Sequence, residues 1–194
     1  MSTSSARVSR ALATVLVIAP LVVAGATCAT AGADQIGPLI KLVDDAALRL
    51  QTADPVAASK YRTGGAVDDP VREGQVIDAV TAAAADRHID TEFVRRVFRD
   101  QIDATDSLEH SRFAQWKIDP ASAPKTAPDL TSSRDVINRL NTEIVQDIAD
   151  QQDALRGLSC PADLQDAKNA AIAKEHLDEL YQRALDYAVH DYCH

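Results

Sequence analysis

The sequence contains little of what strands and nucleic-acid-binding proteins usually need. Aromatic residues make up 4% of its 194 positions and glycine occurs seven times, whereas strands are enriched in aromatic and β-branched residues. Abundant Ala, Leu, Asp, Glu and Arg favour helix over strand. The formal net charge of −9 argues against a nucleic-acid partner, because such proteins usually present a basic face. The composition therefore predicts one helical domain that does not bind nucleic acid.

Charge is absent from the long apolar segment at residues 11–26. Arg7 and Arg10 precede this segment, and the small residues of 29–33 follow it. This order is typical of a secretory signal peptide. A retained membrane anchor is the competing interpretation, which Pro20 and the small residues disfavour.

Cleavage of the signal peptide is expected after Ala33, with cleavage after Ala31 as the nearby alternative. The expected organisation is a removed signal peptide over 1–33 and one mature domain over 34–194. The protein would then be exported, to the periplasm or the medium. Its mature part would have no stable membrane insertion.

Cysteine is scarce, and the expected cleavage leaves only Cys160 and Cys193. Two cysteines in an oxidising compartment most simply form a disulfide bond. A metal site is an alternative, because His190 and His194 flank Cys193, but no second pair of residues at metal-ligand spacing supports it. We therefore expect the disulfide, and neither a metal nor a cofactor.

Apolar residues recur at intervals of three and four along the mature chain, and this period predicts helices. The fold class is expected to be all-α, a single-domain bundle of about six helices with the disulfide in its C-terminal part. The expected helices span residues 35–62, 70–86, 91–114 and 132–156, and two more lie within 161–191. Asp68 or Asp69 would cap the second helix, and Ser132 or Ser133 would cap the fourth.

Two of these segments need a break. Pro55 has no backbone N–H, so the first helix should either kink at Asp54-Pro55 or begin again with Asp54 as its cap. A continuous helix over 161–191 would be about 45 Å long, which would hold the two cysteines too far apart for a disulfide. We therefore expect a break near residues 173–176 and a helical hairpin.

Polar residues lie on helix faces that should be buried. Arg49 and Lys60 share the apolar stripe of the first helix, and Thr105 and Glu109 are neighbours on the stripe of the third. Further charged residues stand at the starts of the second and fourth helices: Asp69, Arg72, Glu73 and Arg134. Buried charges need partners. These groups therefore form structural ion pairs with one another, lie at the stripe edges with their charged ends in solvent, or line a pocket.

A pocket rich in arginine and lysine would bind a small anion. The planar guanidinium group matches a carboxylate in two hydrogen bonds, so several arginines indicate a ligand with more than one carboxylate. The sequence has no nucleophile motif and no phosphate-binding glycine loop. Any chemistry would therefore depend on positioning and electrostatics, with no covalent intermediate.

Several segments resemble a known family. They are RLQTADPVAASKYR (49–62), DDPVRE (68–73), DQIDATDSLEHSRFAQWKIDPASAP (100–124), DLTSSRDVINRLN (129–141) and HLDELYQRAL (176–185). Through them the chain resembles the exported, all-helical chorismate mutases from about residue 36 to residue 193. Those enzymes are isomerases that convert chorismate, a dicarboxylate, to prephenate by a Claisen rearrangement within one molecule. The resemblance implies that the substrate supplies the counter-charge for the inward cations.

The resemblance also implies binding roles, carried over by position. Arg49 and Arg134 would hold carboxylates, and Thr105 would help to seat the ring carboxylate. Arg72 would contact the enolpyruvyl side of the substrate. Val76 departs from the family pattern, since a polar residue is expected near the pocket at this point.

Two residues would act on the ether oxygen of the substrate. Lys60 and Glu109 would each donate a hydrogen bond to this atom as it gains negative charge. An ionised carboxylate has no proton to donate, so Glu109 must be protonated in the active complex, with a pKa raised by apolar walls or by the bound dianion. Asp69 and Glu73 lie where the family holds the ring hydroxyl and neighbouring polar groups.

The exported class tends to complete its active site within one chain, and homodimers are common in the family, so a homodimer is expected. The alternative function is that of an exported helical anion-binding protein that has lost catalysis. The presence of Lys60, Arg49, Arg72 and Glu109 together favours the enzyme.

Overall fold

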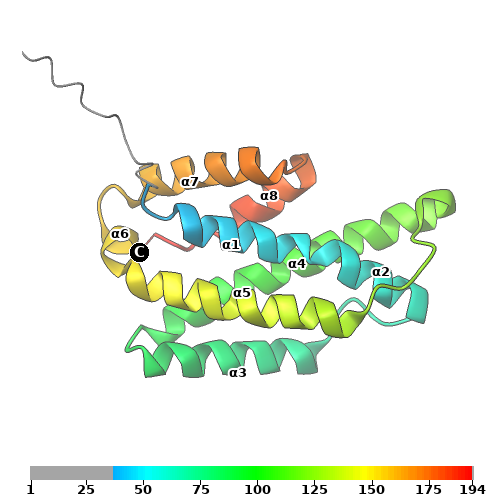
Figure 1. The fold of residues 1–194 in the computed structure, drawn as a ribbon, viewed down its shortest axis with the longest axis horizontal. Coiled ribbons are helices and arrows are strands. Elements are labelled where there is room, and N and C mark those ends of the chain that lie inside the picture. Colours follow the sequence, from blue (N-terminus) through cyan, green and yellow to red (C-terminus); the bar gives the residue numbers. More distant parts are fainter. Residues whose placement is uncertain (1–36, 194) are drawn as a thin grey trace, which may run out of the picture. The chain divides into compact units, whose positions relative to one another are not determined.

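The computed structural model of the protein describes residues 37–193 as a bundle of α-helices (Figure 1). The helices are α1 (Ile40–Gln51), α2 (Ala53–Thr63), α3 (Pro70–Asp86), α4 (Thr91–Ile118), α5 (Leu130–Asp150), α6 (Gln152–Arg156), α7 (Cys160–Glu175) and α8 (Glu179–Ala188), with a short 3-10 helix, η1, over Pro120–Ser122. These residues contain no β-strand, which confirms the all-α prediction. The expected signal peptide and its two cleavage sites lie outside the described residues. None of the helices between residues 37 and 193 has both the length and the apolar character that a membrane crossing requires.

The first predicted helix is divided into α1 and α2. Pro55 has no N–H to donate to the carbonyl group of Gln51, four residues earlier, so the helix loses a hydrogen bond there. The break falls at Thr52, whose hydroxyl group donates to the Arg49 carbonyl oxygen at 2.7 Å. α2 already begins at Ala53, so the alternative in which Asp54 caps a new helix is wrong.

α4 continues past its predicted end at residue 114 and reaches Ile118. The ring of Trp116 accounts for the extra turn, because its centroid lies 5.1 Å from that of Tyr61 on α2 and 6.1 Å from that of Phe113. These contacts form a small apolar cluster between α2 and α4, and such packing stabilises a helix more than propensity does. The loop that follows is therefore shorter than predicted.

Aspartate side chains cap several helix N-termini. Asp69 accepts a hydrogen bond from the first turn of α3, which confirms one of the two predicted caps. Asp129 does the same for α5, so this helix begins at Leu130 and the predicted caps, Ser132 and Ser133, lie inside its first turn. A carboxylate suits this position because its charge also interacts favourably with the helix dipole.

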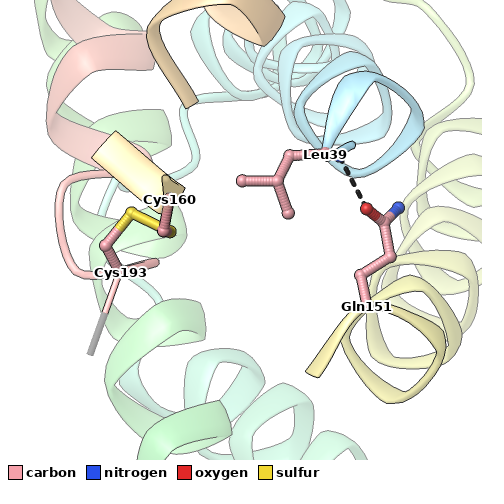
Figure 2. The surroundings of a disulfide bond; sticks show 4 residues. All are labelled: Leu39, Gln151, Cys160 and Cys193. Atoms are coloured by element: carbon pink, nitrogen blue, oxygen red, sulfur yellow. Dashed lines mark hydrogen bonds between the residues drawn. A yellow bond between two sulfur atoms is a disulfide. The ribbon is translucent and has the colours of Figure 1, made fainter. Parts of the chain in front are cut away.

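The C-terminal segment folds back as a helical hairpin, as predicted. α7 ends at Glu175, the capping residue His176 adopts the left-handed conformation with φ 53°, and α8 begins at Glu179. The return of the chain brings Cys160 and Cys193 together in a disulfide bond with their Cα atoms 5.7 Å apart (Figure 2). This confirms the predicted disulfide and removes Cys193 from the alternative metal site.

α1 occupies the centre of the bundle and packs against α4, α5, α7 and α8 (Figure 1). Its inward side chains are fully buried: Leu42, Val43, Ala46, Ala47 and Leu50. Its start is joined to the α5–α6 junction, since the backbone N–H of Leu39 donates to Oε1 of Gln151 at 2.6 Å (Figure 2). α3 completes the bundle by packing against α4 and α5.

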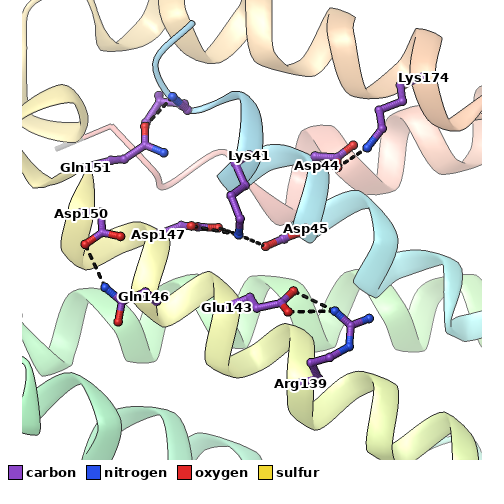
Figure 3. A network of polar contacts seen from close by, with 11 residues as sticks. Lys41, Asp44, Asp45, Arg139, Glu143, Gln146, Asp147, Asp150, Gln151 and Lys174 are labelled. Atoms are coloured by element: carbon purple, nitrogen blue, oxygen red, sulfur yellow. Dashed lines mark hydrogen bonds and ion pairs between the residues drawn. The ribbon is translucent and has the colours of Figure 1, made fainter. Parts of the chain in front are cut away.

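A polar network fixes α1 to two of its neighbours (Figure 3). Nζ of Lys41 lies 2.8 Å from Oδ2 of Asp45 and 2.9 Å from Oδ2 of Asp147 on α5. Nζ of Lys174 on α7 lies 2.6 Å from Oδ2 of Asp44. Burial raises the pKa of Asp147, and Lys41 opposes this effect. The network orients α1 without using any residue of the predicted site.

Loss of the disulfide should destabilise this fold. The bond joins residues separated by 33 positions, and the chain-entropy model gives about 4 kcal/mol for a loop of this length. The double variant Cys160→Ala/Cys193→Ala should therefore lose roughly 2–4 kcal/mol of unfolding free energy in urea titrations. Wild-type protein under reducing conditions should match the variant. Equal unfolding free energies for variant and oxidised wild type would contradict the prediction.

Candidate active site

A single pocket, formed by α1 to α5 of one chain, brings together every residue predicted for the site. The space of about 610 Å³ between its lining atoms includes open solvent, so the pocket is a cleft that a ligand can enter from outside. Its polar lining is Arg49, Lys60, Asp69, Arg72, Glu73, Thr105, Asp106, Glu109 and Arg134. Its apolar lining is Val56, Val67, Val76, Ile102, Leu130 and Ile137. The residues are assembled, and the roles assigned to them remain predictions.

Arg49 of α1 carries a buried charge with neutral partners only. Its side chain is 4% exposed, and its Nε donates to Oδ1 of Asn141 at 2.8 Å. Its Nη1 donates to the carbonyl oxygen of Gln101 at 3.1 Å and to Oγ1 of Thr105 at 3.2 Å. It forms no ion pair with any of the described residues. Burial lowers the pKa of Arg49 to about 10, against the opposing effect of the nearby negative charge of Asp106, so the group stays charged at neutral pH without a direct ion pair among the described residues.

Lys60 of α2 and Glu109 of α4 form an internal ion pair. Nζ of Lys60 lies 2.8 Å from Oε2 of Glu109 and donates to the carbonyl oxygen of Val67 at 2.6 Å. An ammonium group has three N–H donors, so these two contacts leave one for a ligand. Burial raises the pKa of Glu109 to about 7, against the opposing effect of Lys60. A protonated Glu109 is therefore accessible near neutral pH.

The remaining predicted residues lie toward the mouth of the pocket. Nη2 of Arg72 donates to Oδ1 of Asn138 at 2.7 Å. Nη1 of Arg99 lies 3.0 Å from Oε2 of Glu73. Arg134 is exposed. Asp69, Arg72 and Glu73 are half-buried, and the carboxylate of Asp69 also caps α3. These side chains give the mouth both signs of charge.

Two residues of the site were not predicted from the sequence. Asp106 lines the pocket, and burial raises its pKa to about 6, with Glu73 adding to the shift and Lys60 opposing it. Asp106 comes directly after Thr105 and does not lie on the apolar stripe of α4. The spacing of apolar residues therefore could not identify it as a pocket residue. Asn141 is buried on α5, three residues before Ile144 on that helix's apolar stripe. A polar residue on an apolar stripe was the same signal that identified Arg49.

The carboxylates of the pocket share it with arginine and lysine side chains. These positive charges would repel a metal cation. One group of side chains outside the pocket has metal-ligand geometry among the described residues: Asp100, His190 and Asp191, with ligand atoms within 4.8 Å of one another. Nε of Arg96 lies 3.9 Å from Oδ2 of Asp191 and competes with a cation for this carboxylate. The group therefore adds nothing to the chemistry of the pocket.

Comparison with known proteins identifies the family. A family model described as "Chorismate mutase type II" matches residues 40–110, the segment that contributes Arg49 through Glu109 to the pocket. The secreted chorismate mutase of Mycolicibacterium smegmatis is 53% identical over 176 residues, which is 91% of this chain and 97% of the relative. The chain belongs to the chorismate mutase family. The secreted chorismate mutase of Mycobacterium tuberculosis is 45% identical over 84% of this chain and 82% of its own length.

Solved structures of chorismate mutases share the fold. The crystal structure of chorismate mutase from Burkholderia thailandensis aligns with a TM-score of 0.76 at 29% identity, over 80% of this chain and 99% of the other. Both curated relatives are secreted chorismate mutases, which confirms the expectation that this member of the family is an exported isomerase.

Glu109 should titrate well above the ordinary glutamate range in the free protein. Its pKa is raised to about 7 by burial, while Lys60 favours the ionised form. Lys60→Met removes the opposing positive charge and should raise the Glu109 pKa further. NMR of protein with ¹³C-labelled glutamate measures both values, and Glu109→Gln assigns the resonance. A Glu109 pKa near the glutamate reference of about 4.3 would contradict the prediction.

Proposed function

We propose that this chain converts chorismate to prephenate in the Arg49–Glu109 pocket by an intramolecular Claisen rearrangement. A carbon–oxygen bond breaks while a carbon–carbon bond forms, with no covalent enzyme intermediate and no cofactor. The observation that supports this site most directly is the buried Arg49, which has no counter-ion among the described residues and lies in the same pocket as the Lys60–Glu109 pair. A dicarboxylate substrate would supply the missing negative charge.

Arginines at both ends of the pocket would hold the carboxylates. Arg49 is buried and Arg134 is exposed, so the two would bind the substrate from the closed end and from the mouth. Thr105, which already accepts from Arg49, would help to seat the ring carboxylate. Arg72 would contact the enolpyruvyl side. Binding at several points would select the compact conformer in which the reacting carbons are close.

Two donors would stabilise the transition state. The remaining N–H of Lys60 and the protonated carboxyl group of Glu109 would both donate to the ether oxygen as it gains charge. Asp69 and Glu73 would orient the ring hydroxyl from the start of α3. Val76 would contribute an apolar wall beside them, in place of the polar residue that the family pattern suggests.

Export would proceed through removal of residues 1–33, which leaves the pocket helices intact because α1 begins at Ile40. The homodimer stays a prediction. All eight residues expected to bind the substrate line this one pocket, so the proposed site would need no residue from a second subunit.

Lys60→Ala should abolish most of the activity. Loss of a preorganised donor to transition-state charge costs about 10²–10³ in rate, so kcat for chorismate should fall by roughly this factor. The measurement is chorismate consumption, followed by ultraviolet absorbance with purified residues 34–194. Lys174→Ala, which changes an exposed lysine on α7, should keep wild-type kcat. Folded wild-type protein that binds the product but consumes no chorismate would favour the anion-binding alternative.

Glu109→Gln should remove the alkaline loss of activity. The donor form of Glu109 is the protonated one, so kcat/KM of the wild type should fall roughly tenfold per pH unit above the Glu109 pKa. Glutamine donates at every pH, and the variant should show a flat profile there. Glu143→Gln is the matched control, since it makes the same substitution at a glutamate that pairs with Arg139 outside the pocket, and it should keep the wild-type alkaline limb. An alkaline limb that persists in Glu109→Gln would show that another group controls it.

A further inference from the structure

Two pocket arginines are held by neutral amide groups. Oδ1 of Asn141 accepts from Nε of Arg49 at 2.8 Å, and Oδ1 of Asn138 accepts from Nη2 of Arg72 at 2.7 Å. The two asparagines are three residues apart on α5, so their side chains share one helix face. Neither arginine forms an ion pair within residues 37–193, although four carboxylates line the same pocket.

Arginines outside the pocket mostly have charged partners. Arg139, which follows Asn138 directly on α5, lies 2.9 Å from Oε1 of its partner Glu143. Arg112 on α4 lies 2.6 Å from Oδ1 of Asp54. Neutral side-chain acceptors also occur outside the pocket: Arg87 donates to Gln146 on the surface, and Arg112 donates to Gln115 in addition to its contact with Asp54. On α5, Glu143 thus pairs with the outward Arg139, whereas two asparagines accept from Arg49 and Arg72 of the pocket.

The chemical difference between amide and carboxylate matters most at Asn141, which is 6% exposed. Arginine offers donors only, so the amide group must turn its oxygen toward Arg49. This contact satisfies the buried Nε–H and fixes the plane of the guanidinium group. A carboxylate at the same place would form a buried ion pair with Arg49, and a substrate carboxylate would have to compete with it.

We propose that Asn141 and Asn138 are positioning residues, which orient Arg49 and Arg72 through neutral acceptors and so keep both positive charges available for the carboxylates of the substrate. This inference rests on the proposed function of the pocket. It means that part of the affinity for the substrate depends on residues of α5 that need not contact the substrate.

The test replaces each amide group with a carboxylate of the same shape. Asn141→Asp should raise KM for chorismate about tenfold or more while kcat changes much less, because the carboxylate weakens ground-state and transition-state binding alike. Asn138→Asp should shift KM in the same direction by a smaller factor, since its site is exposed. The dissociation constant of prephenate, measured by calorimetry, should rise in parallel. Asn169→Asp, on an exposed face of α7, makes the same substitution far from the pocket and should leave both constants unchanged.

The outcomes separate the inference from the site assignment. KM does not depend on the folded fraction, and Asn138→Asp lies at an exposed position, so partial unfolding of Asn141→Asp does not obscure the result. The inference would be overturned if Asn141→Asp and Asn138→Asp both had the same KM and the same prephenate dissociation constant as the control Asn169→Asp. Arg49→Ala is measured beside them. If it raises KM while the asparagine variants do not, only the inference fails; if it leaves KM unchanged, the proposed site fails.

Discussion

The buried guanidinium group of Arg49 is the constraint on which the rest of the site depends. A charge that is 4% exposed and has no counter-ion among the described residues is costly unless hydrogen bonds and a ligand compensate for it. Its donors reach Asn141 on α5 and Gln101 and Thr105 on α4, so three helices must keep their relative positions. The Lys41 network, on another part of α1, independently fixes two of these helices, α1 and α5, to each other (Figure 3).

Lys60 and Glu109 differ from Arg49 because their charges already face each other within the pocket. Lys60 favours the ionised form of Glu109, whereas burial and the negative charge of Asp106 favour the protonated form. Burial dominates, and the pKa is raised to about 7, which keeps the proton that a donor to the ether oxygen needs. Asp106 thus contributes to the chemistry of Glu109 without any predicted contact with the substrate.

Features that repeat along the chain were predictable, and features that depend on one tertiary contact were not. The three-to-four spacing gave the helices and the inward polar residues, and the length of the last segment required the hairpin that joins Cys160 to Cys193. The end of α4 depends on Trp116 packing against α2, which no local pattern reveals. The spacing of apolar residues does not identify Asp106, because it lies off the apolar stripe. The hydrogen-bond partners of Arg49 depend on how α5 packs against α1.

The C-terminal disulfide connects the stability of the fold to the geometry of the pocket. Cys193 directly follows Tyr192, which is 1% exposed. Burial raises the pKa of Tyr192, while a side-chain interaction with Gln101 and the charge of Arg49 lower it. Gln101 is also an acceptor for Arg49. The Cys160–Cys193 bond therefore holds the chain next to a buried side chain that interacts with Gln101, the residue whose carbonyl oxygen accepts from Arg49.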